Sequence, residues 1–217
     1  MSGFSFRKKI EHRLRVFLGR AYRPIVSKAE NFSMLGGEEE GYGVWPCILE
    51  LLNSNSVVYS AGVGFDIKFD LALVERTGVT VFAFDPTPRV VEWINESIDS
   101  SQFRFEPIGL GSQDAEMEFA LPLDEKSVSG TLMAEGALES RKIKVPVERV
   151  RTIMKRLLHE KIDLLKLDIE GAEYGVLRDM LDIGILPTQI LVEFHHGKRK
   201  KGRVPVSETK NLVERLK

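Results

Sequence analysis

An apolar segment that ends abruptly in acidic residues constrains the fold of this chain more than any other feature. The mainly apolar run at residues 162–167 leads directly into Asp168 and Glu170, and a glycine and a helix-forming stretch follow. This pattern is typical of a buried parallel strand that delivers acids to the carboxyl edge of an α/β sheet. Ligands of such sheets bind beyond the carboxyl ends of the strands. We therefore expect Asp168 and Glu170 to lie at a binding site.

Strand and helix patterns alternate from residue 56 onward. The predicted strands are 57–60, 80–84, 103–108, 162–167 and 189–194; the predicted helices are 66–76, 88–98, 148–159, 172–181 and 207–216; extended segments at 116–121 and 142–147 flank a Ser-, Gly- and Ala-rich loop at 127–137. Asp66 and Ser207 suit helix caps, and Pro88 suits a first helical turn. The order predicts a Rossmann-like, doubly wound, mostly parallel sheet with helices on both faces.

Composition and charge narrow the class of protein. The chain has 217 residues, of which 43% are hydrophobic and 29% charged, as in one soluble globular domain. Cys47 is the single cysteine, so there is no internal disulfide. No apolar run is long enough to span a bilayer, and the N-terminus lacks the apolar core of a signal peptide. A cytoplasmic location is expected.

The positive charge is concentrated in two segments. Residues 1–28 are strongly basic, Lys198–Arg203 form a second basic cluster, and the body between them is acidic. Nucleic-acid binding is therefore not expected, since it needs a basic face. Residues 1–40 are predicted to form a basic amphipathic helix and a loop, and this helix either caps the domain or contacts a membrane surface or a partner.

A glycine turn indicates a nucleotide-like cofactor. Gly62 and Gly64 follow a predicted strand and open a helix, and Asp85 ends the next strand about 20 residues later, where a carboxylate can hold a ribose diol. A dinucleotide site would have Gly or Ala at the position of Ile67, and the Asp66 carboxylate would repel a pyrophosphate. Asp66 either caps the helix or meets a cationic, phosphate-free cofactor such as S-adenosylmethionine. An NAD-dependent oxidoreductase is the disfavoured alternative.

Three blocks of sequence resemble the FkbM-type methyltransferases, a family of class I S-adenosylmethionine-dependent enzymes. The blocks are residues 59–70, 84–88 and 164–173, and the last of them, Leu-Leu-Lys-Leu-Asp-Ile-Glu-Gly-Ala-Glu, is the most specific. The resemblance extends over residues 41–196, with 190–195 as the family's next strand. It implies a methyltransferase domain at 41–217 that methylates a small-molecule or sugar hydroxyl with S-adenosylmethionine and no required metal.

The resemblance also implies roles for individual residues. Gly62 and Gly64 would form the cofactor loop, Asp85 would hold the ribose, and Ile108 and Gly109 would lie near the adenine. Asp168 would face either the methionine part of the cofactor or the acceptor. The complete set expected to bind the cofactor is Ser60, Gly62, Gly64, Asp66, Asp85, Ile108, Gly109 and Asp168.

Methyl transfer to a hydroxyl benefits from a base that removes its proton. The predicted catalytic residues are His195, Asp168 and Glu193, with His195 favoured as the base over the alternative of a hydrogen-bonded residue at the sheet edge. A divalent metal held by these side chains and Glu170 is a further alternative, although no metal is predicted. Glu173 is expected to complement the dipole of its helix.

Two departures from the family pattern leave a non-catalytic binding domain as an alternative. Phe65 occupies the position of a glycine often found third in the methyltransferase loop. The class I fold normally adds a strand pair after the last predicted helix, whereas the sequence stops at Lys217, so we expect this C-terminal strand pair to be missing. The loop at 127–137 is expected either to cover the acceptor or to be a surface loop.

Overall fold

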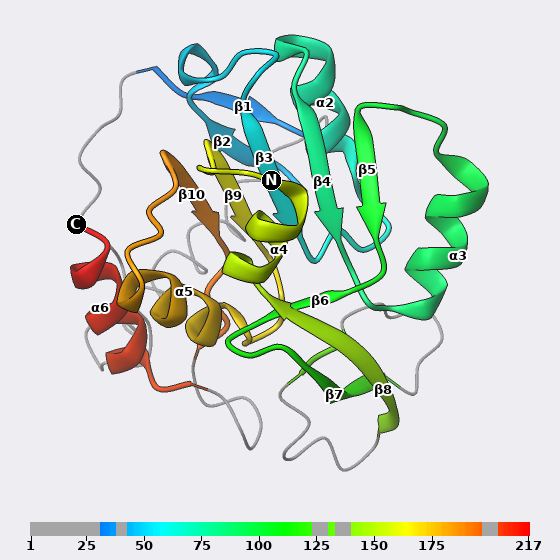
Figure 1. The fold of residues 1–217 in the computed structure, drawn as a ribbon, viewed down its shortest axis with the longest axis vertical. Helices are drawn as coiled ribbons and strands as arrows, with labels where there is room; N and C mark the ends of the chain where they lie inside the picture. Colours follow the sequence, from blue (N-terminus) through cyan, green and yellow to red (C-terminus); the bar gives the residue numbers. More distant parts are fainter. Residues whose placement is uncertain (1–30, 38–42, 123–129, 133–139, 197–203) are drawn as a thin grey trace, which may run out of the picture.

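The computed structural model describes residues 31–37, 43–122, 130–132, 140–196 and 204–217 (Figure 1). Its centre is a five-stranded sheet in the order β10–β9–β3–β4–β5, and every neighbouring pair is parallel. The strands are β3 (Val57–Ala61), β4 (Thr80–Phe84), β5 (Phe103–Glu106), β9 (Leu164–Leu167) and β10 (Gln189–Val192). The chain order reverses between β3 and β9, so the carboxyl ends of these strands flank a topological switch point. The predicted Rossmann-like fold is confirmed.

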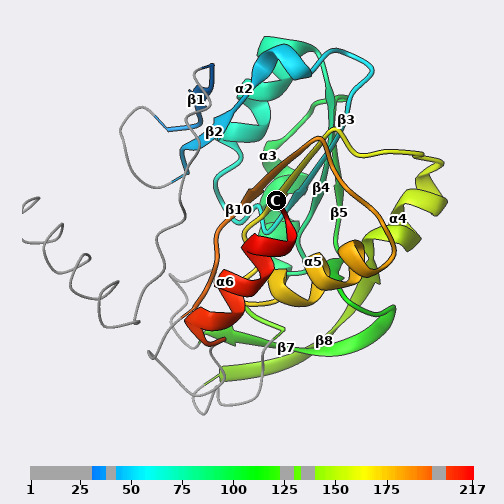
Figure 2. The same ribbon diagram turned by 90° about the vertical axis from the view of Figure 1, so that its left-hand side faces the viewer.

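Helices cover both faces of the sheet (Figures 1 and 2). They are α2 (Lys68–Thr77), α3 (Pro88–Ser97), α4 (Val150–Leu157), α5 (Glu173–Asp182) and α6 (Val206–Arg215). Pro88 is the first residue of α3, where its missing N–H costs no hydrogen bond.

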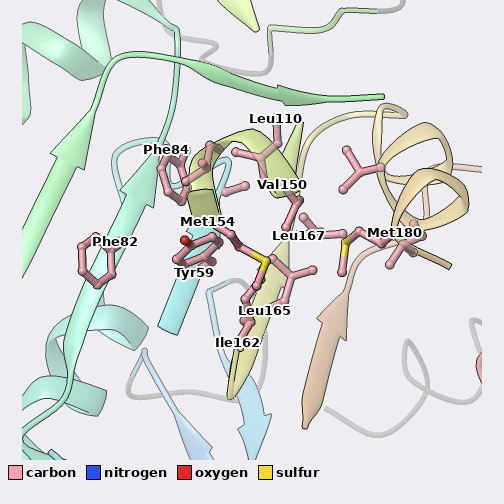
Figure 3. Close-up of a cluster of buried hydrophobic side chains, with 14 of the residues drawn as sticks. Tyr59, Phe82, Phe84, Leu110, Val150, Met154, Ile162, Leu165, Leu167 and Met180 are labelled. Atoms are coloured by element: carbon pink, nitrogen blue, oxygen red, sulfur yellow. The ribbon is translucent and has the colours of Figure 1, made fainter. Parts of the chain in front are cut away.

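Alternate side chains of the strands build a separate core on each face. On the first face, Tyr59, Phe84 and Leu167 pack with residues of α4, α5 and α6, such as Met154 and Met180 (Figure 3). On the opposite face, the neighbouring strand residues pack against α2 and α3; they include Val58, Val81, Ala83 and Leu164. The period of two residues along each strand produces this division, and burial on both faces explains why the strands have almost continuous apolar sequences.

A second, three-stranded sheet lies beside the central one (Figure 1). It consists of β6 (Gly109–Gly111), β7 (Ala115–Pro122) and β8 (Ser140–Arg149) in the order β6–β8–β7, with β7 and β8 antiparallel. The extended segments predicted at 116–121 and 142–147 are thereby confirmed. Near the N-terminus, β1 (Ser33–Leu35) pairs with β2 (Trp45–Cys47).

The structure corrects several predicted element boundaries. The helix predicted at 148–159 begins only at Val150, because Glu148 and Arg149 pair with β6 and extend β8. The strand predicted at 103–108 ends at Glu106, and the chain then enters β6.

Neither of the two predicted helix caps is the N-cap residue in the structure. Ser207 is not the cap of α6, since that helix begins at Val206 after Pro205. Asp66 precedes α2 by two residues, and its Oδ1 accepts the Lys68 N–H at 3.1 Å. The N-cap of α2 is Ile67, so Asp66 lies one residue before the predicted position, although its carboxylate contacts the first N–H of the helix.

Some predictions fall on residues that the structure does not describe. These are the helix within residues 1–30, the cluster Lys198–Arg203 and most of the loop at 127–137. Among the described residues, β10 is an edge of the central sheet and no strand follows α6. No helix in the described ranges is long and apolar enough to cross a membrane.

Candidate functional site

The turn after β3 is built around two glycines in the left-handed region. The φ angles of Gly62 and Gly64 are 75° and 54°, which glycine adopts without steric cost. The Gly62 N–H donates to the Phe84 carbonyl oxygen at 2.9 Å. A β-carbon on Gly62 would lie 1.7 Å from the carbonyl oxygen of Asp168. Only glycine therefore lets the ends of β3 and β9 approach this closely.

Asp85 joins the end of β4 to this glycine turn. Its Oδ2 accepts the Gly64 N–H at 3.0 Å and its Oδ1 accepts the Thr87 N–H at 2.9 Å. The side chain is only 5% exposed, and burial raises the pKa of Asp85, whereas hydrogen bonds from the side chain and main chain of Thr87 and from Gly64 oppose the increase. A carboxylate has about four acceptor positions, so part of this capacity remains for a ligand.

Two hollows meet at the glycine turn. The first, a cavity of about 70 Å³, is lined on one side by Asp85, Gly109 and Leu110. The second, a cleft of about 560 Å³, is lined by residues that include Trp45, Lys166 and Glu193. Gly62, Gly64 and Asp168 line both. The cleft is within the range of roughly 300–1,000 Å³ that is usual for small-molecule pockets.

Six of the eight residues expected to bind the cofactor line one or both of these hollows: Gly62, Gly64, Asp66, Asp85, Gly109 and Asp168. Ser60 and Ile108 line neither of them. Ser60 is fully buried in β3, and the Ile108 side chain, 9% exposed, packs in the core that contains α4 and α5. The main chain next to Ile108 nevertheless reaches the first cavity through Gly109.

The three predicted catalytic residues lie together where β9 and β10 end. Asp168, Glu193 and His195 each have a carboxylate oxygen or ring nitrogen within 4.8 Å of those of the other two. Glu170 joins this group, since its Oε2 is 3.6 Å from His195 Nε2. The acids lie near the hollows because the parallel strands β9 and β10 both end at the same edge of the sheet.

Glu173, the first residue of α5, holds the two turns of this cluster in place. Its carboxylate is fully buried; Oε2 accepts the Gly171 N–H at 2.7 Å, and Oε1 accepts the main-chain N–H of His195 at 2.8 Å. The predicted position in the first helical turn is confirmed. The bond to His195 was not foreseen, because nothing in the spacing of the two residues indicates it.

The charges of the cluster shift its protonation. Burial, followed by repulsion from Glu193, raises the pKa of Asp168 to about 6. Burial alone would lower the pKa of His195, but the carboxylates of Glu173, Glu170 and Asp168 outweigh it and raise this pKa to about 9. At neutral pH His195 is therefore charged in the free protein, and Asp168 is the group with a pKa close to neutrality.

Lys166 is a charged residue of the site that the sequence reasoning missed. It lies in the middle of β9, is 3% exposed and lines the second cleft. Its Nζ is 5.0 Å from the centre of the Trp45 ring, a cation–π contact. The only available signal was a lysine inside an otherwise apolar strand.

The described part of the 127–137 loop forms a wall of the first cavity, to which Gly130 and Leu132 contribute. Thr131 pairs with Ala120 of β7, and its Oγ1 donates to the main-chain carbonyl of Glu170 at 2.8 Å. This short segment is thereby tied both to the second sheet and to the turn after β9.

Taken together, a parallel sheet with a glycine turn, an acid after the next strand and two hollows at its carboxyl edge are the features of a Rossmann-like domain with a candidate ligand site at that edge. Comparison with known families then identifies it: residues 60–216 match the model of the methyltransferase FkbM domain. The chain belongs to the FkbM methyltransferase family, which confirms the resemblance seen in the sequence.

Comparison with individual proteins adds little to this assignment. No curated protein matches the chain. Among solved structures, it is similar to the crystal structure of methyltransferase FkbM from Methylobacillus flagellatus KT, with a TM-score of 0.42 and 13% sequence identity. The match covers 75% of this chain and 38% of that protein, so the chain corresponds to well under half of that protein's length.

Proposed function

We propose that this protein transfers a methyl group from S-adenosylmethionine to a hydroxyl oxygen of a small molecule, such as a sugar. The observation that carries the proposal is the contact between Gly64 and Asp85, whose N–H···Oδ2 distance is 3.0 Å. It places the glycine turn and the acid expected to hold the ribose at one cavity. Membership of the FkbM family makes methyl transfer the chemistry to expect there.

The residues around the two hollows fit this cofactor. Asp85 retains acceptor positions for a ribose diol, and the main chain at Gly62 and Gly64 is open to close approach. Asp66, Asp168 and Glu193 line the cleft together with one lysine, Lys166. Their negative charge favours a sulfonium and opposes a pyrophosphate, which supports S-adenosylmethionine over NAD.

When bound, S-adenosylmethionine supplies an electrophilic methyl group for an in-line displacement. The protein lowers the barrier by holding the acceptor oxygen close to that methyl group and in line with it. We assign the acceptor to the larger cleft, because Asp168 lines both hollows and lies between them.

The proton of the acceptor hydroxyl then passes to Asp168, whose pKa of about 6 suits a base at neutral pH. His195 was the base favoured from the sequence. Its pKa of about 9 leaves it protonated in the free protein. We therefore propose that His195 orients and balances the carboxylates, while Glu193 completes the acceptor side of the cluster.

Calorimetric titration with S-adenosylmethionine tests the cofactor assignment. The wild type should bind S-adenosylmethionine, and NAD should give no heat of binding. Asp85→Asn should weaken the binding by about 10- to 100-fold, because hydrogen bonds to a charged group contribute roughly 1.5–3 kcal/mol. Asp114→Asn is the matched control, since Asp114 also accepts a backbone N–H, from Arg149, but lies outside the two hollows.

Transfer of a labelled methyl group to a panel of sugars and other hydroxyl compounds tests the reaction itself. Labelled product that survives mild base, as an ether does, supports O-methylation. Binding of S-adenosylmethionine without transfer to any metabolite fraction would instead support the non-catalytic binding domain. Binding of NAD in its place would refute the proposal.

A further inference from the structure

We infer that the cluster at the ends of β9 and β10 binds a divalent metal ion through Asp168, Glu193 and His195. Each side chain offers one ligand atom, and the three atoms lie within 4.8 Å of one another. Ligands bonded to one ion at about 2.0–2.2 Å are roughly 3–4 Å apart. Small rotations of these side chains would therefore bring all three onto a common ion.

The side chains of the cluster face one another without closing direct hydrogen bonds. His195 Nε2 lies 3.8 Å from Asp168 Oδ1 and 3.6 Å from Glu170 Oε2. Charge-assisted N–H···O bonds are usually about 2.7–2.9 Å long. A cation between the groups would replace these loose contacts with short bonds and would offset the repulsion between the carboxylates.

Glu173 positions the histidine for this role. Its Oε1 holds the main chain of His195 and lies 3.4 Å from Nδ1 of the ring. Nδ1 is buried and makes no hydrogen bond of good geometry in this conformation, and Glu173 is the carboxylate beside it. Ligating histidines commonly direct their second nitrogen to a carboxylate. The ion would displace the Nε2 proton, because a ligating imidazole is neutral, and Nε2 faces Asp168.

The mixed donor set selects the kind of ion. Carboxylates suit Mg²⁺, Ca²⁺ and Mn²⁺, whereas imidazole suits the transition metals. Two carboxylates and one imidazole therefore favour Mn²⁺. Three protein ligands also leave positions for water or for an oxygen of a substrate.

The ion would lie between the two hollows, where Asp168 lines both and Glu193 lines the larger cleft. There it would hold the acceptor oxygen. This role rests on the proposed function; binding of the ion does not.

Titration of the chelator-treated protein with MnCl2, followed by calorimetry, tests the site. Wild type should bind one Mn²⁺ in a saturable way, and Glu193→Gln should weaken the binding at least about 10-fold. Glu193 is exposed, so this variant should fold normally. Asp66→Asn is the matched control: Asp66 lines the same cleft but is not a proposed ligand, and asparagine can still accept the Lys68 N–H. This control should bind Mn²⁺ within about threefold of wild type, since it changes only a screened charge.

Absence of saturable binding to wild type, or equal weakening in both variants, would overturn the metal site. Pulsed electron paramagnetic resonance of the Mn²⁺ complex adds a direct readout, because a histidine ligand produces nitrogen modulation; its absence from wild type would also overturn the proposal. Titration of S-adenosylmethionine in excess chelator separates the two hypotheses. Cofactor binding without Mn²⁺ binding refutes the metal site alone, and Mn²⁺ binding without cofactor binding refutes the proposed function alone.

Discussion

Replacing Gly62 by alanine probes the contact on which the site is built. The new β-carbon would lie 1.7 Å from the carbonyl oxygen of Asp168, and the residue has a φ of 75°. Alanine in the left-handed region costs about 1–2 kcal/mol. Because the overlapping atom belongs to the backbone, relief requires movement of the β9 turn, and such overpacking typically costs a further 1–3 kcal/mol or so. Gly62→Ala should therefore lower the free energy of unfolding by about 2–5 kcal/mol.

Gly184→Ala is the matched control. Gly184 has a φ of 73°, and a β-carbon there would have no atom within 4 Å. The two variants share the backbone cost and the effect of alanine on the unfolded chain, so their difference isolates the contact with Asp168. Urea unfolding of both proteins measures it. Equal destabilisation would refute the close approach of β3 and β9.

The same variant should also fail to bind the cofactor well. Moving the carbonyl of Asp168 away from Gly62 separates two of the three residues that line both hollows. Calorimetry should show at least tenfold weaker binding of S-adenosylmethionine to Gly62→Ala, since displacements of about 1 Å can cost that much or more. Gly184→Ala should bind it like wild type.

Two further predictions concern residues around the site. Burial raises the pKa of Asp70 above 3.8 in the fold, so the folded protein loses stability as the pH rises through the folded pKa. Asp70→Asn should therefore stabilise the protein more at pH 8 than at pH 4. An equal gain in the free energy of unfolding at the two pH values, measured with urea, would contradict this. Thr131→Val removes the bond to Glu170 and should weaken cofactor binding about fivefold, for a loss near 1 kcal/mol. Thr152→Val, which removes a bond to exposed Asp114, is its control, and unaltered affinity of Thr131→Val would refute the prediction.

The sequence predicted those parts of the fold that depend on local patterns. Apolar runs that end in glycine or in an acid identified β3, β4 and β9, and the alternation of elements indicated a parallel sheet. Because every parallel strand ends at the same edge, the positions of Gly62, Asp85 and Asp168 near one another followed from the order of elements alone.

Features that depend on pairing between distant segments could not be predicted in this way. Glu148 is a residue type that is common at the start of a helix, and only its pairing with β6 places it in a strand. Lys166 contacts the ring of Trp45, which belongs to β2. The bond from His195 to Glu173 joins the end of β10 to the start of α5. The spacing of neighbouring residues in the sequence does not indicate such contacts.

The protonation of the cluster formed by Asp168, Glu193 and His195 could not be predicted either. An isolated histidine near a sheet edge has an ordinary pKa near neutrality, which made His195 the natural candidate for a base. Three carboxylates around it raise its pKa to about 9. The histidine could be identified from its position after a strand, whereas the number of acids around it could not.

A crystal structure of this protein with S-adenosylhomocysteine would test the central claim most directly. The proposed function predicts that the ribose hydroxyls lie within hydrogen-bonding distance, about 3.2 Å or less, of the Asp85 carboxylate. It also predicts that the sulfur lies beside Asp168, facing the cleft that contains Glu193. A ribose bound elsewhere, or a ligand whose sulfur is directed away from that cleft, would contradict it.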